Sequence, residues 1–145
     1  ICLEGTEIIG AFLARELAKE GHTSINSGKD ICVITPETNA NNQMIFRDNI
    51  KKHVFNKQIL LLISSASTGK TINRSVECLQ YYNGQLAGVA SIFSAINEHN
   101  GIQINSIFTS EDLNNYETMS AHDCKLCKSG QKVDAIINSF GYSKI

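Results

Sequence analysis

A chain of 145 residues, of which 42% are apolar and 19% are charged, is long enough to bury a hydrophobic core. We therefore expect a single domain over residues 1–145. Because the first residue is Ile1 and it opens a strand-like stretch, we also expect a further N-terminal segment in the natural chain. The formal net charge of −1 argues against a general nucleic-acid or membrane-surface binder, because such proteins usually carry a basic excess. No apolar run approaches the roughly 20 residues that a membrane-spanning helix needs, and we expect a cytoplasmic protein.

The first half of the chain alternates between strand-like and helix-like patterns. Residues 1–3 predict the end of a strand, and apolar residues at helical spacing predict a helix over 8–18. A short buried strand is predicted at 31–35, ended by Pro36, and a second at 59–63.

The same alternation continues through the second half. A helix is predicted over 72–82, followed by strands over 86–93 and 102–108. The apolar residues of 133–140 predict a short closing helix. Strands that alternate with helices predict an α/β fold, with a mostly parallel central sheet and flanking helices.

A polar loop follows the predicted strand at 59–63 and precedes the predicted helix, and we call it the 67–71 loop. Its residues are Ser67, Thr68, Gly69, Lys70 and Thr71. Hydroxyl groups, a glycine and the free N–H groups of a helix N-terminus suit a phosphate group. Gly69-Lys70-Thr71 also matches the end of the nucleotide-binding pattern G-x-x-x-x-G-K-S/T, but Ser64 stands where that pattern has its first glycine. The third alternative is an ordinary Ser/Thr cap on a helix.

Several further segments, in the order in which they occur, strengthen the first of these alternatives, a Ser/Thr-rich loop that binds a phosphate group. They are Glu4-Gly-Thr-Glu-Ile-Ile-Gly-Ala11, the 67–71 loop, Leu86-Ala-Gly-Val89, residues 101–113 and His122-Asp-Cys-Lys-Leu-Cys-Lys-Ser-Gly130. With these segments, the chain resembles orotate phosphoribosyltransferase-like proteins of the type I phosphoribosyltransferase family over nearly all its length. The resemblance implies the fold of that family and a 5′-phosphate-binding role for the 67–71 loop.

The resemblance also implies a reaction, a metal and a partner. In the family, a base nitrogen displaces pyrophosphate from the ribose of phosphoribosyl pyrophosphate, while Mg²⁺ bridges the pyrophosphate. Such a pentosyl transfer serves nucleotide metabolism and pyrimidine biosynthesis, and a homodimer is expected. The resemblance assigns the pyrophosphate loop to Glu4, Gly5 and Thr6, and the mobile loop to residues 47–53, with Arg47 and Lys51 as pyrophosphate contacts.

Two departures from the family bear on activity. The family has two ribose-binding acids where this chain has Ile63 and Ser64, and it has an Asp-Arg pair where this chain has Ser94 and Ala95. A carboxylate makes strong charge-assisted bonds to hydroxyls, whereas an isoleucine makes none. The alternative to an active transferase is therefore a non-catalytic or regulatory homologue that binds a phosphorylated ribose ligand.

The five cysteines form two groups. Cys2, Cys32 and Cys78 lie in apolar patterns and are expected to be buried thiols in a reducing cytoplasm. Cys124 and Cys127 form a C-x-x-C pair close to His122. These three residues offer zinc ligands, with the remaining ligand to come from a distant residue such as His99 or from a partner subunit. The pair can equally be a redox dithiol, or two thiols in a C-terminal turn.

Overall fold

The computed structural model describes residues 1–19, 29–41, 43–120, 122–138 and 141–145. Its elements in chain order are α1 (Glu7–Leu17), β1 (Glu37–Thr38), β2 (Met44–Ile45), α2 (Asp48–Lys51), β3 (Gln58–Ala66), α3 (Lys70–Tyr81), β4 (Gln85–Ser94), β5 (Glu98–His99), β6 (Ile102–Thr109), the 3-10 helix η1 (Ser110–Asp112), α4 (Lys125–Lys128), β7 (Ala135–Asn138) and β8 (Gly141–Lys144). The fold is mixed α/β, as the alternation in the sequence predicted. No helix in the described ranges is long and apolar enough to cross a membrane.

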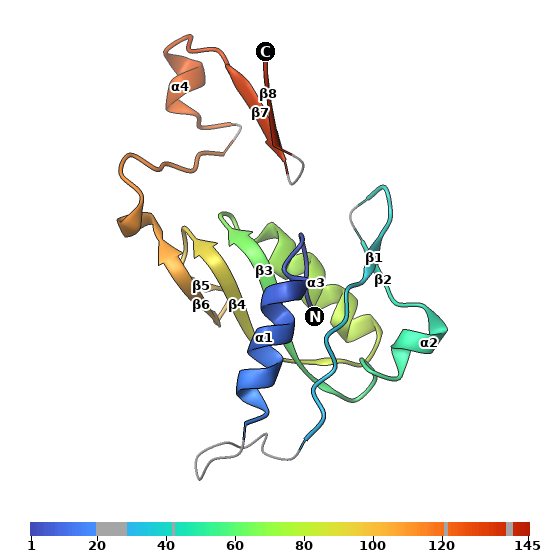
Figure 1. The fold of residues 1–145 in the computed structure, drawn as a ribbon. Helices are drawn as coiled ribbons and strands as arrows, with labels where there is room; N and C mark the ends of the chain where they lie inside the picture. The colour runs from blue at the N-terminus through green and yellow to red at the C-terminus, as the bar shows by residue number, and fades with distance from the viewer. Residues whose placement is uncertain (20–28, 42, 121, 139–140) are drawn as a thin grey trace.

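A four-stranded mixed sheet forms the centre of the molecule, with the strand order β3-β4-β6-β5. The pairs β3–β4 and β4–β6 are parallel, whereas the short strand β5 is antiparallel to β6. The predicted strands at 59–63, 86–93 and 102–108 are thereby confirmed. Because the three parallel strands point the same way, their carboxyl ends lie at one edge of the sheet (Figure 1).

The N-terminal residues extend the sheet on the side of β3 that faces away from β4. Leu3 N donates to Leu62 O over 2.9 Å, Leu62 N donates to Ile1 O over 2.8 Å, and Cys2 forms a parallel bridge with Leu62. The predicted strand end at 1–3 is thus confirmed. It places the turn that follows it beside the carboxyl end of β3.

Helices cover both faces of the sheet around β3 (Figure 1). Side chains alternate between the faces of a strand, and Leu61 and Ile63 pack in the core with Ile72 and Leu79 of α3. On the other face, α1 approaches closely through Gly10, where an added Cβ would lie 2.2 Å from Cys2 Sγ and 3.6 Å from Leu62 Cδ2. The predicted helices at 8–18 and 72–82 are confirmed as α1 and α3.

Two of the predicted elements are wrong. Residues 31–35 form no strand: Ile31 and Val33 are exposed, although Ile34 O accepts a 2.9 Å bond from Cys2 N. The closing helix predicted at 133–140 is instead the strand β7, which pairs with β8 in an antiparallel hairpin. Its last two positions lie outside the described residues. The hairpin and α4 stand apart from the central sheet (Figure 1).

Candidate functional site

The 67–71 loop connects the carboxyl end of β3 to the amino end of α3. β3 ends at Ala66 and α3 begins at Lys70, so that residues 67–69 alone make the connection. Gly69 is the N-cap of α3 and has φ +73°, a left-handed conformation that favours glycine. No side chain caps α3, and Gly69 O accepts from Asn73 N over 3.0 Å. The free N–H groups and the dipole of the helix end therefore favour an anion there.

The short connection argues against the nucleotide-binding alternative. That pattern needs a loop that begins at position 64 and wraps around the phosphates. Here Ser65 and Ala66 are still paired with Phe93 and Ser94 of β4. The backbone before residue 67 is thus committed to the sheet, and the loop that this pattern needs is not formed.

His99 supports the loop from the side of β5. The ring lies so close that a Cβ added to Gly69 would stand 2.3 Å from His99 Nδ1. His99 Nε2 is 3.0 Å from Asn73 Oδ1, and Asn100 Nδ2 donates to the same oxygen over 3.0 Å. The sequence suggested His99 as a candidate zinc ligand. It gave no sign of this contact, because the order of the strands in the sheet brings His99 and Gly69 together.

The predicted pyrophosphate loop lies beside the same end of β3. Thr6 is 1% exposed, and its Oγ1 donates to Leu3 O over 2.9 Å and to Leu62 O over 3.2 Å. Glu4 and Gly5 form the turn with φ +57° and +80°. This turn brings the Glu4 carboxylate next to β3, where it accepts a hydrogen bond from Ser64 Oγ.

The positions that should hold the ribose-binding acids differ sharply in their surroundings. Ile63 is fully buried in the core, whereas the neighbouring Ser64 is half-buried and bonds Glu4. A carboxylate is therefore present beside Ser64, but it comes from the N-terminal turn. The sequence alone could not identify Glu4 in this position, because the contact joins residues 60 positions apart.

Arg47 and Lys51 are not brought to the 67–71 loop. Arg47 forms a two-pronged ion pair with Glu37 (2.8 and 2.6 Å), and Lys51 pairs with Asp48 over 2.8 Å. Lys51 also lies 5.9 Å from the ring of Tyr82, at the carboxyl end of α3. Since a helix rises about 1.5 Å per residue, the length of α3, roughly 18 Å, separates this end from the loop.

Ser94, at the position where the family has its Asp-Arg pair, has a structural role. Its hydroxyl is buried, donates to Ile96 O over 2.6 Å, and lies 3.4 Å from Ala66 O. Ala95 N donates to the same Ala66 O over 2.8 Å. These bonds hold the ends of β3 and β4 together, and no guanidinium group comes from this position.

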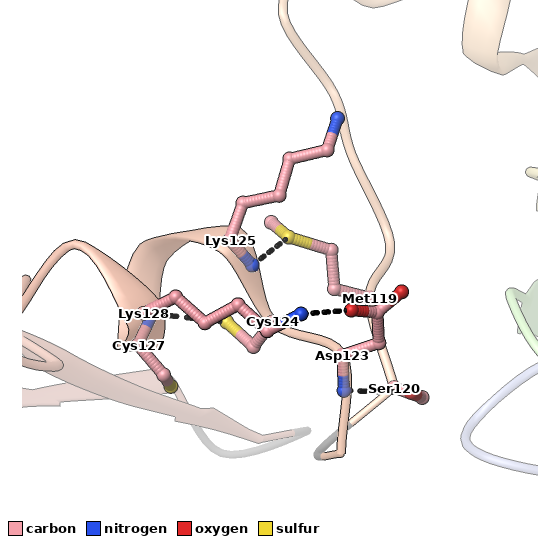
Figure 2. Close-up of polar contacts among 7 residues, drawn as sticks. All are labelled: Met119, Ser120, Asp123, Cys124, Lys125, Cys127 and Lys128. Carbon is pink, nitrogen blue, oxygen red and sulfur yellow. Dashed lines mark hydrogen bonds and ion pairs between the residues drawn. The ribbon is translucent and has the colours of Figure 1, made fainter.

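Cys124 and Cys127 are brought together at the start of α4 (Figure 2). Cys127 N donates to Cys124 Sγ over 3.4 Å. This backbone hydrogen bond lowers the pKa of Cys124, whereas the neighbouring Cys124 side chain raises the pKa of Cys127. Among the described residues, no group of three His, Cys, Asp or Glu side chains is placed to hold a metal ion, so zinc bound with His122 stays a prediction.

The remaining cysteines only partly fit the expected burial. Cys2 is buried and Cys78 is partly buried, with burial raising the pKa of its thiol. Cys32 is exposed, which corrects the prediction, because the segment that carries it forms no buried strand. Cys32 Sγ lies 3.3 Å from His53 Nδ1, a contact that the sequence did not predict.

No protein-family model matches this chain, and no curated protein matches it. Its functional interpretation consequently depends on the residues gathered at the carboxyl end of β3. They are Glu4, Gly5 and Thr6, the Ser64 hydroxyl, the 67–71 loop and the supporting ring of His99.

Proposed function

We propose that this chain binds a 5′-phosphorylated ribose at the 67–71 loop and acts as a phosphoribosyltransferase of the orotate-like group. The observation that carries the proposal is an uncapped helix N-terminus, reached by a three-residue link, at the carboxyl end of a parallel strand. In open α/β sheets, ligands bind outside the carboxyl ends of the strands.

The side chains of the loop are suited to a phosphate group. Within the described ranges, the hydroxyls of Ser67, Thr68 and Thr71 make no intramolecular hydrogen bond, and Lys70 is exposed without an ion-pair partner. Hydroxyl and N–H groups donate to phosphate oxygens, and the lysine adds a positive charge. Together with the first N–H groups of α3, they would surround a phosphate with donors.

Glu4 is the carboxylate best suited to the ribose in this proposal. Its carboxylate accepts from Ser64 Oγ near the carboxyl end of β3, and the residue is exposed to solvent. A carboxylate makes strong hydrogen bonds to sugar hydroxyls and stabilises positive charge at a reacting carbon. Mg²⁺ would enter on the pyrophosphate, and Glu4 is an oxygen donor of the type that this ion prefers.

A second candidate function is a non-catalytic binder of the same ligand. It is favoured because this chain has other residues at 63–64 and 94–95, where the family has two acids and an Asp-Arg pair. Ile63 is committed to the core, and Ser94 is committed to backbone carbonyls. Neither position supplies the acid or the arginine of an active transferase. Binding and turnover must therefore be measured separately.

Titration calorimetry with phosphoribosyl pyrophosphate and with nucleoside monophosphates tests binding. Release of pyrophosphate over a panel of bases, with Mg²⁺, then tests transfer. Turnover supports the transferase, and binding without turnover supports the non-catalytic homologue. Failure to bind any of these ligands would contradict both.

A variant of the loop makes the binding test specific to the site. Thr68→Val removes one exposed hydroxyl at nearly constant shape, and we expect phosphate-ligand binding to weaken by about tenfold, since hydrogen bonds to charged groups are strong. Thr38→Val, which removes an exposed hydroxyl from β1, is the matched control and should bind as the unchanged protein does. Equal affinities for the two variants would exclude Thr68 from the site.

A further inference from the structure

The C-x-x-C pair lies in a part of the chain that the proposed function does not use. Cys124 is the N-cap of α4, and Cys127 follows one turn later (Figure 2). Cys127 is exposed, and Cys124 is partly exposed. Both sulfurs are therefore open to reactants from solvent.

The Cys124 sulfur already accepts a hydrogen bond from the backbone of Cys127. Cys127 N donates to Cys124 Sγ over 3.4 Å, and this backbone hydrogen bond lowers the pKa of the Cys124 thiol. The turn that holds them is closed by bonds from Lys128 N to Cys124 O (3.0 Å) and from Gly130 N to Cys127 O (3.1 Å). An N–H that donates to a sulfur stabilises its thiolate, which is the form that reacts.

The neighbouring groups leave the Cys124 sulfur accessible. Asp123, the nearest acid in sequence, acts to raise the pKa of the Cys124 thiol, and its ion pair with Lys128 reduces this effect. Lys125 N donates to Met119 Sδ over 3.3 Å, and Asp123 N donates to Ser120 Oγ over 3.2 Å (Figure 2). These bonds tie the preceding segment to the turn without covering either cysteine.

We propose that Cys124 and Cys127 form a redox-active dithiol that exchanges with low-molecular-weight disulfides, with Cys124 as the attacking thiol. A metal site is the competing use of the same sulfurs. Within the described part of the chain, however, no third ligand side chain joins them, whereas an internal disulfide needs no further residue.

The exchange proceeds in two balanced steps. The Cys124 thiolate attacks one sulfur of the small disulfide, the S–S bond of that disulfide breaks, and one thiolate leaves and takes a proton. Cys127 then loses its proton and attacks Cys124 Sγ, which breaks the mixed disulfide and releases the second small thiol. The protein dithiol is oxidised by two electrons, and the small disulfide is reduced to two thiols.

The test incubates the full chain in a series of reduced-to-oxidised glutathione ratios, then quenches it with acid and alkylates the free thiols. Peptide mapping by mass spectrometry should show a Cys124–Cys127 disulfide that appears and disappears reversibly with the ratio. Cys127→Ser should accumulate a mixed disulfide on Cys124. In Cys124→Ser, Cys127 should react with glutathione disulfide about tenfold more slowly than Cys124 does in Cys127→Ser.

Cys32→Ser is the control, because Cys32 is also an exposed thiol but its described neighbour is the imidazole of His53. This variant should leave the Cys124–Cys127 exchange unchanged. Circular dichroism of each serine variant checks that the fold is retained. The peptide mapping of the Cys124–Cys127 disulfide uses the unchanged protein, so it tests the proposal even if a variant does not fold. The proposal is overturned if no ratio yields the linked peptide, if both single variants react equally fast, or if purified protein holds one zinc per chain that protects both thiols.

Discussion

The carboxyl end of β3 and the C-terminal segment that carries α4 place their reactive groups in different ways. At β3, the groups come from distant parts of the chain, and the fully buried Ile63 and Ile72 fix the elements that carry them. In the C-terminal segment, the bonds around Cys124 span 3 to 6 positions. Ile136 and Ile137 of the adjoining hairpin are 60% and 78% exposed.

This difference indicates what each region depends on. The geometry around the 67–71 loop exists only when the core is packed, so a change in the core should remove binding and stability together. The geometry around Cys124 depends on one turn of local backbone. Changes there should alter thiol chemistry while the free energy of unfolding of the sheet stays nearly constant.

The largest effect is expected from placing an acid at Ile63. Ile63→Asp would bury an unpaired carboxylate in a fully buried position, and we expect the free energy of unfolding to fall by about 4 kcal/mol or more. Ser64→Asp is the matched control, because that side chain is half-buried at the edge of the sheet, and it should cost far less. Urea unfolding of both variants measures the difference. If Ile63→Asp were as stable as Ser64→Asp, the core would not be what positions the loop.

The next largest effect is expected at Gly69. Gly69→Ala combines a left-handed backbone with a Cβ 2.3 Å from His99 Nδ1. We expect a loss of about 2 kcal/mol in the free energy of unfolding, together with weaker phosphate binding. Gly101→Ala shares the positive φ, +78°, but its Cβ would meet nothing within 4 Å, so it should show the backbone cost alone.

A double variant separates the two causes at Gly69. Gly69→Ala with His99→Ala removes the ring that the new methyl group meets, and it should be less destabilised than the two single changes together would give. Strict additivity of the two free-energy changes, measured by urea unfolding, would contradict the close packing of His99 on Gly69.

A smaller effect is expected from removing the C-terminal hairpin. A chain that ends at residue 130 loses β7 and β8, which pair with each other, and the free energy of unfolding should change by less than about 1 kcal/mol. Tyr116→Ala is the comparison, because Tyr116 packs edge-on against Phe93 of β4 with the ring centroids 4.8 Å apart. It should cost about 1 kcal/mol. A truncation that destabilised the sheet more than Tyr116→Ala would mean that the hairpin is part of the core.

Elements with a strong local pattern could be predicted from the sequence. The apolar run before Ser64 made β3 visible, and the glycine and lysine at its end marked the start of α3. The turn at Glu4 and Gly5 was visible for the same local reason. Each of these signals lies within a few residues of the structure that it produces.

The errors came where short apolar runs fit more than one structure. Val133, Ile136 and Ile137 lie at spacings that suit a helix, yet Ile136 and Ile137 lie in β7, and Gly141, at φ +129°, begins the strand that pairs with it. The run at 31–35 has the composition of a buried strand but forms no strand, and its bond to the N-terminal residues is made through Ile34 O. Periodicity over so few residues does not separate the two structures.

The contacts that complete the candidate site could not be predicted at all. The Glu4–Ser64 bond joins residues 60 positions apart, and the approach of His99 to Gly69 depends on the order of strands in the sheet. A single sequence contains the residue types for these contacts but no signal of their distance. Tertiary packing decides which of the candidate groups meet.

The smallest expected effect is the pH dependence of the stability that the Glu37–Arg47 ion pair contributes. This pair lies on the surface, so it tests whether such a contact is as independent of the core as the contacts of the C-terminal segment. The Arg47 guanidinium bonds both oxygens of Glu37 and holds the pKa of that carboxyl below its ordinary value. Because the folded pKa lies below the unfolded one, the pair stabilises the fold above the unfolded pKa of about 4.3. That contribution is lost as the pH falls through the folded pKa.

A double-mutant cycle with Glu37→Gln and Arg47→Met, followed by urea unfolding at neutral and acid pH, measures this coupling. Both side chains are open to water, so we expect a small coupling at neutral pH that salt weakens and acid removes. The Asp48–Lys51 pair on α2 provides an internal comparison with the same sign, because its lysine likewise lowers the pKa of its carboxyl. A coupling that persisted in acid would mean that groups other than Glu37 hold Arg47. The β1–β2 hairpin would then depend on packing against the core, as the 67–71 loop does.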